Sequence, residues 1–244
     1  MNTITSLDNA KVKKYCKLQK KKYRDEYQEF IVEGMHLVQE AYRTGYLDEI
    51  ILLENEPVPF PVSATYFTKE IMAKISTMDT PSTIMGLCHK KDSNKLQGNK
   101  ILILDDIQDP GNLGTIIRSA KAFNVDTIVL SENTVDLYNP KVLRATQGIL
   151  FYMNIINREI EELVKELKKQ HIPLYGTSVV NGINVKELLP EEKDKYALIM
   201  GNEGNGINSK LLSLCDKKLY IKMNNDVESL NVAIATSILL YELG

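Results

Sequence analysis

The chain beyond residue 100 is built around short apolar runs that do not alternate with polar residues. These runs are 101–104, 127–130, 174–177, 197–200 and 219–221. Helical patterns lie between most of them, at 113–123, 159–170 and 208–214. A strand that is apolar on both sides must be covered on both sides, which is the situation in a parallel sheet flanked by helices. The sequence therefore predicts an α/β domain with a parallel sheet over residues 100–244.

The polar segment KKDSNKLQGN, residues 90–99, separates this domain from a smaller N-terminal region. Before it, a strand at 30–32, a helical pattern at 35–42 and a strand at 49–53 predict one βαβ unit. A strand at 64–67, a helix at about 69–75 and a strand at 83–88 predict a second. We therefore expect an N-terminal arm at 1–24, a small α/β domain at 25–92 and a linker at 93–99.

The average charge hides a strongly basic segment. With 244 residues, 43% of them hydrophobic, the chain is long enough for a sizeable core, and a net charge of −2 favours neither nucleic acid nor a membrane as partner. Residues 11–24, however, read KVKKYCKLQKKKYR and contain no acid. This arm is either a solvated helix face or a source of phosphate contacts.

Cysteines, histidines and acidic residues give no sign of a metal site. Cys16, Cys88 and Cys215 are far apart, which supports neither a disulfide framework nor a zinc site. The three histidines are isolated, and the acidic loop at 105–109 is of a kind that is usually solvated. No apolar run approaches the roughly 18 residues that span a bilayer. We expect a soluble cytoplasmic protein without a metal.

A first polar loop, residues 105–112, follows the first apolar run of the large domain. It turns at Pro110-Gly111 and leads into a helix, for which Asn112 is a suitable N-cap. Arg118 lies in the second turn of that helix, where its guanidinium could contact a phosphate or polarise a hydroxyl. The alternative is an ordinary helix cap and a surface arginine paired with an acid.

A second loop, GNEGNGI at 201–207, follows the strand that ends at Met200. Its glycines allow close approach of the backbone to a ligand. The spacing is GxxGxG, so neither the dinucleotide fingerprint nor a P-loop matches, which argues against a Rossmann-type enzyme. Glu203 would repel a bare phosphate. A simple turn after a strand is the alternative for this loop taken alone.

A third loop, 221–231, leads into the last helix. Leu230, Ile234, Ile238 and Tyr241 recur at helical spacing, which indicates core packing. Ser229 is a good N-cap, but Asn231 would lie in the first turn of the helix, where it is a poor helix former. Asn231 is therefore a candidate site residue.

The three loops together resemble a known family. The segments DPGNLGTIIRSAKAF, LIMGNEGNGI and IKMNNDVESLNVAIATSILLYE resemble, in this order, the three motifs of the SpoU (TrmH-like) branch of the SPOUT RNA methyltransferases. The resemblance implies a parallel sheet with a deep trefoil knot over 100–244, preceded by a small L30e-like RNA-binding domain. It also implies S-adenosylmethionine as cofactor and methyl transfer to a ribose 2′-hydroxyl.

The resemblance carries site residues over by motif position. The implied cofactor contacts are Gly201, Ile221, Leu230, Thr177 and Met223. The implied catalytic residues are Arg118, Asn112, Glu203, Ser229 and Asn231. Because arginine keeps its proton at any ordinary pH, we expect Arg118 to stabilise a developing alkoxide or to hold the adjacent phosphate rather than to act as a base.

The family also implies partners. It predicts a homodimer that involves the C-terminal helix, and an RNA substrate. Lys20, Lys21, Lys22, Arg24 and Arg118 are the expected RNA contacts. The two-domain layout favours 23S ribosomal RNA, and the alternatives are methylation of transfer RNA or a non-catalytic RNA-binding protein on the same fold.

Overall fold

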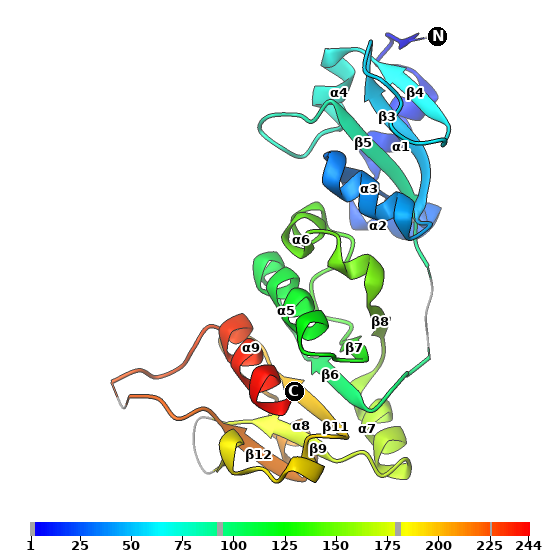
Figure 1. Ribbon diagram of the computed structural model, residues 1–244. Helices are drawn as coiled ribbons and strands as arrows, with labels where there is room; N and C mark the ends of the chain where they lie inside the picture. Colours follow the sequence, from blue (N-terminus) through cyan, green and yellow to red (C-terminus); the bar gives the residue numbers. More distant parts are fainter. Residues whose placement is uncertain (1–2, 92–94, 179–181, 225) are drawn as a thin grey trace. The chain divides into compact units, whose positions relative to one another are not determined.

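The computed structural model describes residues 3–91, 95–178, 182–224 and 226–244, and the chain divides into two compact units (Figure 1). The N-terminal unit contains Met1–Lys91 together with Asp136–Tyr152. The C-terminal unit contains Asp92–Val135 and Met153–Gly244. Residues 93 and 94 of the expected linker lie outside the described residues.

The segment 136–152 differs from the expected division, which places it in the large domain. Its side chains bond to the N-terminal unit. The contacts are Asp136 with Arg24 at 2.5 Å, Arg144 with Thr77 at 2.9 Å and Tyr152 with Glu40 at 2.6 Å. Such contacts link residues more than 60 positions apart, so no local pattern in the sequence predicts them.

The N-terminal unit is a five-stranded sheet with helices. Its elements are β1 (Thr3–Ile4), α1 (Ala10–Lys17), α2 (Lys21–Tyr27), β2 (Glu29–Glu33), α3 (Met35–Arg43), β3 (Leu47–Leu53), β4 (Ala64–Phe67), α4 (Lys69–Ile75), β5 (Ile84–His89), α6 (Pro140–Thr146) and the 3₁₀ helix η1 (Ile149–Tyr152). The strand order is β1-β4-β3-β5-β2. The sheet is therefore mixed rather than parallel throughout.

The first expected βαβ unit is confirmed and the second is wrong. Strands β2 and β3 both run antiparallel to β5, so they are parallel to each other. Strand β4 is parallel to β3, which makes β5 antiparallel to β4. Leu53 pairs with Phe67 and Leu52 with Ile84, so the chain leaves β4 and enters β5 at the same end of the sheet.

The basic arm is part of this unit rather than a separate tail. Helices α1 and α2 form most of it, and Val12, Tyr15 and Leu18 are buried in one core cluster with Phe67. Asn9 caps α1 by accepting a hydrogen bond from the Lys11 amide. Because Val12, Tyr15 and Leu18 point inward, most lysines of the arm lie on the exposed face.

The C-terminal unit contains a seven-stranded sheet whose strand pairs are all parallel. Its elements are β6 (Lys100–Leu104), α5 (Pro110–Ala122), β7 (Thr127–Leu130), β8 (Asn154–Asn157), α7 (Ile160–Lys169), β9 (Leu174–Thr177), β10 (Ile183–Asn184), η2 (Val185–Glu187), η3 (Pro190–Glu192), β11 (Tyr196–Met200), α8 (Ser209–Leu214), β12 (Lys217–Tyr220) and α9 (Val232–Leu243). The strand order is β10-β12-β9-β11-β6-β7-β8. The predicted parallel sheet is confirmed.

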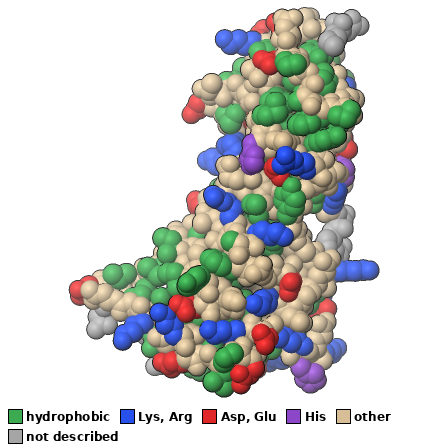
Figure 2. Space-filling view, in the orientation of Figure 1, with side chains coloured by type: hydrophobic (Ala, Val, Ile, Leu, Met, Phe, Trp, Pro, Cys, Tyr) green, Lys and Arg blue, Asp and Glu red, His purple; other side chains and the backbone are tan. Residues whose placement is uncertain are grey.

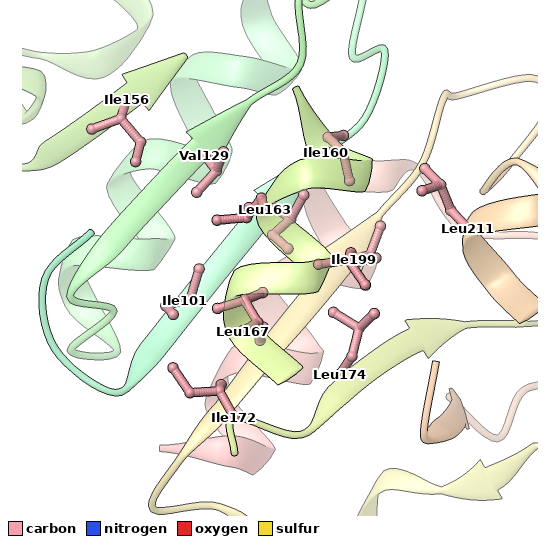
Figure 3. Close-up of a cluster of buried hydrophobic side chains, with 13 residues drawn as sticks. Ile101, Val129, Ile156, Ile160, Leu163, Leu167, Ile172, Leu174, Ile199 and Leu211 are labelled. Carbon is pink, nitrogen blue, oxygen red and sulfur yellow. The ribbon is translucent and has the colours of Figure 1, made fainter. Parts of the chain in front are cut away.

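Helices cover both faces of this sheet, which explains why apolar residues in its strands do not alternate with polar ones. Leu163 and Leu167 of α7 pack onto Ile101 and Ile199 of the central strands (Figure 3). The alternate strand residues face the other way, toward α5 and α9 (Figure 1). These two helices lie side by side, with Ser119 bonded to Ser237 at 2.7 Å. Within the described ranges, no helix has the length and apolar character needed to cross a membrane.

Candidate functional site

Four neighbouring strands of the C-terminal sheet end beside one another. The order β12-β9-β11-β6 is uninterrupted and parallel, so the carboxyl ends of these strands share one edge. The loops that follow β6, β11 and β12 are the three polar loops singled out in the sequence. This edge is where open α/β sheets bind ligands.

A pocket of about 480 Å³ lies among these loops, within the range of small-molecule sites. It is lined by all five residues predicted to contact a cofactor, which are Thr177, Gly201, Ile221, Met223 and Leu230. Apolar side chains from β11, β12 and α9 form much of the remaining wall. Glu203 and Glu228 are the charged residues of the lining, and among its described members there is no cation.

The glycine-rich loop folds tightly against itself. A Cβ at Gly201 would lie 2.3 Å from the backbone of Gly206 and Ile207, so only glycine suits this position. Asn202, which the sequence reading did not select, organises the loop: its Oδ1 accepts hydrogen bonds from the Gly204 and Asn205 amides at 2.9 and 3.0 Å. An asparagine among glycines is a turn signal, and could have been recognised.

Asn202 also ties the second loop to the first. Its Nδ2 donates to the Asp106 carbonyl at 2.9 Å. Asp106 has a φ of 61°, a left-handed conformation that aspartate tolerates better than most residues. Asn202 therefore holds the two loops together through a bond from its side chain to the backbone of Asp106.

Glu203 receives hydrogen bonds from the start of α5. Its Oε1 accepts from the Asp109 amide and from Asn112 Nδ2, each at 3.1 Å, and the Gln108 amide lies 3.2 Å from Oε2. Burial acts to raise the pKa of Glu203, but the bonds from Asn112, Asp109 and Gln108 outweigh it and hold the pKa below its ordinary value. The carboxylate is ionised at neutral pH and is held by three donors from the start of α5.

Asp109 rather than Asn112 caps α5, which corrects the sequence prediction. The helix begins at Pro110, and the Asp109 carboxylate accepts a 2.8 Å bond from the Asn112 amide. Proline is favoured at the first helical position, because it has no N–H to satisfy. The Asn112 side chain therefore does not cap the helix, and it bonds to Glu203 instead.

Asn231 caps α9, which corrects both the expected cap at Ser229 and the expected helical position of Asn231. The helix spans Val232–Leu243, and Asn231 Oδ1 accepts from the Ala233 and Ile234 amides at 2.9 and 3.3 Å. Its Nδ2 donates to Asn112 Oδ1 at 2.9 Å. Glu203, Asn112 and Asn231 therefore form one hydrogen-bonded chain across the three loops.

The two other predicted catalytic residues lie differently. Ser229 is exposed and lines the pocket. Arg118 lies on α5, is exposed, and is not among the lining residues. Over the described ranges Arg118 has no hydrogen bond or ion pair, so its guanidinium is available to a ligand.

The acidic loop at 105–109 positions backbone groups of the site. No group of three histidine, cysteine, aspartate or glutamate side chains in the described part of the chain could hold a metal ion. Burial and the neighbouring Asp106 raise the pKa of Asp105. The loop serves instead to place the backbone that Asn202 and Glu203 bond to.

One predicted RNA contact is wrong. Arg24 is only 3% exposed, donates to Asp136 Oδ2 at 2.5 and 3.0 Å, and donates to the Leu18 carbonyl at 2.8 Å. A guanidinium that is buried and paired with Asp136 inside the protein is not accessible to a phosphate. Lys20, Lys21 and Lys22 are exposed, as their predicted role requires.

Comparison with known proteins gives family matches to both parts of the chain. The sequence profile of the SpoU rRNA Methylase family matches residues 99–241, and that of the MRM3-like substrate binding domain matches residues 9–86. The 23S rRNA (guanosine(2553)-2′-O)-methyltransferase RlmP of Bacillus subtilis is 37% identical over 100% of this chain and 99% of its own length.

Solved structures agree along the whole chain. An AdoMet-bound rRNA methyltransferase from Sinorhizobium meliloti is 28% identical, with a TM-score of 0.87 over 99% of this chain and 97% of that one. An RNA 2′-O ribose methyltransferase is 25% identical, with a TM-score of 0.83 over 99% and 98% of the two chains.

Proposed function

The chain belongs to the SpoU rRNA methylase family, and we propose that it transfers a methyl group from S-adenosylmethionine to a ribose 2′-hydroxyl of 23S ribosomal RNA. The observation that carries this proposal is the pocket at the sheet edge, beside the bonded chain Glu203–Asn112–Asn231. The 23S target is supported by the RlmP relative, which covers the full chain.

The pocket suits S-adenosylmethionine, an amphipathic and positively charged molecule. We assign its binding to Thr177, Gly201, Ile221, Met223 and Leu230, which offer apolar side chains and closely approaching backbone. The acidic lining suits a positive charge on the ligand. When bound, the cofactor supplies an electrophilic methyl group on a positively charged sulfur.

The protein must activate and orient a poor nucleophile. The Arg118 guanidinium is exposed and makes no hydrogen bond or ion pair with a described residue, so it can stabilise charge developing on the ribose oxygen or hold the neighbouring phosphate. Glu203 is a weak base, because hydrogen bonds from Asn112, Asp109 and Gln108 hold its pKa low. We therefore assign Glu203, Asn112 and Asn231 to positioning the loops, and Ser229 to contact at the pocket mouth.

We further propose that the protein is a homodimer that uses α9. Ile234 and Tyr241 are 53% and 67% exposed on this apolar helix. Hydrophobic side chains are visible on the surface of the C-terminal unit where α9 lies (Figure 2), and burial of such side chains stabilises association. We also expect the trefoil knot of the family around the pocket loops, and a cytoplasmic location beside the RNA substrate. Sedimentation velocity of Ile234→Lys would show a monomer if α9 forms the interface, and an unchanged dimer would exclude it.

The central test combines target mapping with cofactor binding. Ribose methylation is mapped in RNA from a strain that lacks the gene, and we expect one 2′-O-methyl group missing from 23S ribosomal RNA. A missing mark in transfer RNA would instead support the alternative target. Calorimetry with S-adenosylmethionine separates the enzyme from a non-catalytic RNA-binding protein, which would produce no binding heat.

A further inference from the structure

The lysines of the basic arm fall into two groups. The first group pairs with carboxylates at 2.6 to 2.9 Å: Lys11 with Glu49, Lys13 with Asp8 and Lys14 with Glu29. The second group is exposed and, within the described residues, has no acidic partner: Lys17, Lys20, Lys21 and Lys22. Of the lysines in the arm, only those of the second group carry a positive charge that is not paired with a described carboxylate.

Two tyrosines lie beside this second group. Tyr23 and Tyr27 are one helical turn apart on α2, and their rings stack with centroids 6.2 Å apart and an interplanar angle of 17°. Lys17 and Lys22 place their ammonium groups 5.3 and 5.8 Å from the Tyr23 centroid. Tyr23 is partly exposed, and its hydroxyl has no hydrogen-bond partner in the part of the chain that the structure describes.

We propose that Tyr23, stacked on Tyr27 and contacted by Lys17 and Lys22, is a stacking platform for an unpaired nucleobase of the RNA substrate. The exposed Lys20 and Lys21 lie shortly before Tyr23 in the chain. This inference rests on the proposed function in requiring that the substrate is RNA. Bases stack on aromatic side chains while lysines bind the adjoining phosphates. Neither the ring stack nor a base-binding role is implied by the lysine-rich sequence alone.

The lysine positions are compatible with an incoming base. Cation–π contacts reach to about 6 Å and are weak at exposed sites, so ammonium groups at 5.3 and 5.8 Å are loosely held. A base that stacks on Tyr23 displaces them toward its own phosphates, where their charge is better compensated. Glu26 is an exposed acid on α2, but it is outnumbered by the unpaired lysines.

The RNA must be unpaired at this point. In a double helix, base faces are covered by their neighbours, whereas bases in loops and bulges can leave the stack and lie on an aromatic ring. A partner that needs only positive charge, such as an anionic membrane or an acidic protein, gains nothing from the ring. The aromatic and basic groups together therefore favour a loop or bulge in RNA.

The test uses the full-length protein and an RNA stem-loop with 2-aminopurine in the loop, whose fluorescence is quenched by stacking. Wild type and Tyr23→Phe should quench it and bind alike. Tyr23→Leu should lose the quenching and bind about tenfold more weakly. The matched control is Tyr42→Leu, because Tyr42 also stacks on an aromatic ring, Phe60 at 4.6 Å, but no described lysine ammonium lies over either ring.

The outcomes separate the platform from the proposed function. Wild-type affinity and quenching in Tyr23→Leu would overturn the platform. Replacing Lys20, Lys21 and Lys22 by glutamine should flatten the salt dependence, each lost phosphate contact changing the slope by about 0.7 for single-stranded RNA. If the lysine replacements weaken RNA binding but Tyr23→Leu does not, the surface binds phosphates only and the stacking platform is overturned. Failure of the wild-type protein to bind any RNA at low salt would instead contradict the proposed function.

Discussion

The side chain of Asn231 joins the starts of two helices: its Nδ2 donates to Asn112 Oδ1 on α5 at 2.9 Å, while its Oδ1 caps α9 by accepting from the Ala233 amide. The Nδ2 group of this amide therefore links the two helix starts, and its Oδ1 atom caps α9. Because Asn112 in turn bonds to Glu203, displacement of Asn231 is transmitted to all three loops. This division makes the structural and functional roles of Asn231 separable by mutation.

Asn231→Asp should keep stability and lose activity. Aspartate caps helices about as well as asparagine, so the free energy of unfolding should stay within about 0.5 kcal/mol of wild type. Aspartate has no side-chain N–H to donate to Asn112, so the exposed bond between the two side chains is lost at a small cost in stability, about 0.5 kcal/mol. Because that bond positions the loops, turnover should fall about tenfold or more. Asn231→Ala, the comparison variant, should lose both. Urea denaturation and single-turnover methylation measure the two effects, and full activity in Asn231→Asp would refute the separation.

Glu203 should make stability depend on pH. Its pKa is lower in the folded protein than in the unfolded chain, so its contribution is fully present above the ordinary value and is lost as the pH falls through the folded value. Glu203→Gln should therefore be less stable than wild type at pH 7, and this difference should shrink at about pH 3.5. The free energy of unfolding of both proteins at each pH tests this, and an equal difference at the two pH values would contradict it.

The starts of the helices show where sequence reasoning reaches its limit. Asn112 and Ser229 were both suitable caps, but Asp109 and Asn231 hold those positions. Several polar residues compete for each helix start, and propensity does not rank them. At α5 the Asn112 side chain bonds instead to Glu203, which lies more than 90 residues away in the sequence. The sequence identified the right loops but not the bonding within them.

The fold was predictable where a pattern was local. Apolar runs predicted the parallel sheet of the C-terminal unit, because each run had to be covered on both faces. The direction of β5 was not predictable, since a strand in a mixed sheet carries no mark of its orientation. Arg24 was read as a surface residue, because its partner Asp136 lies 112 positions away. Long-range pairing is the common reason for these differences.

Gly201→Ala should close the pocket while Gly204→Ala should leave it intact. The new methyl group at Gly201 would lie 2.3 Å from the backbone of Gly206, whereas at Gly204 the nearest atom is Asn202 Oδ1 at 3.6 Å. Overpacking of this kind costs about 1–3 kcal/mol, and it displaces residues that line the pocket. We expect at least a tenfold weaker Kd for S-adenosylmethionine in Gly201→Ala by calorimetry. Equal affinity in both variants would contradict the assigned pocket.

Arg118 should affect turnover without affecting cofactor binding. It is exposed, lies outside the pocket lining and makes no hydrogen bond within the described residues, so Arg118→Ala should leave both the Tm and the Kd for S-adenosylmethionine unchanged. Removing a group that stabilises transition-state charge lowers turnover by about 10²–10³-fold. Arg118→Lys keeps the charge but not the planar fork, so partial activity would indicate charge stabilisation. Wild-type turnover in Arg118→Ala, together with inactivity of Asn231→Ala, would move the catalytic role from Arg118 to the bonded chain of Glu203, Asn112 and Asn231.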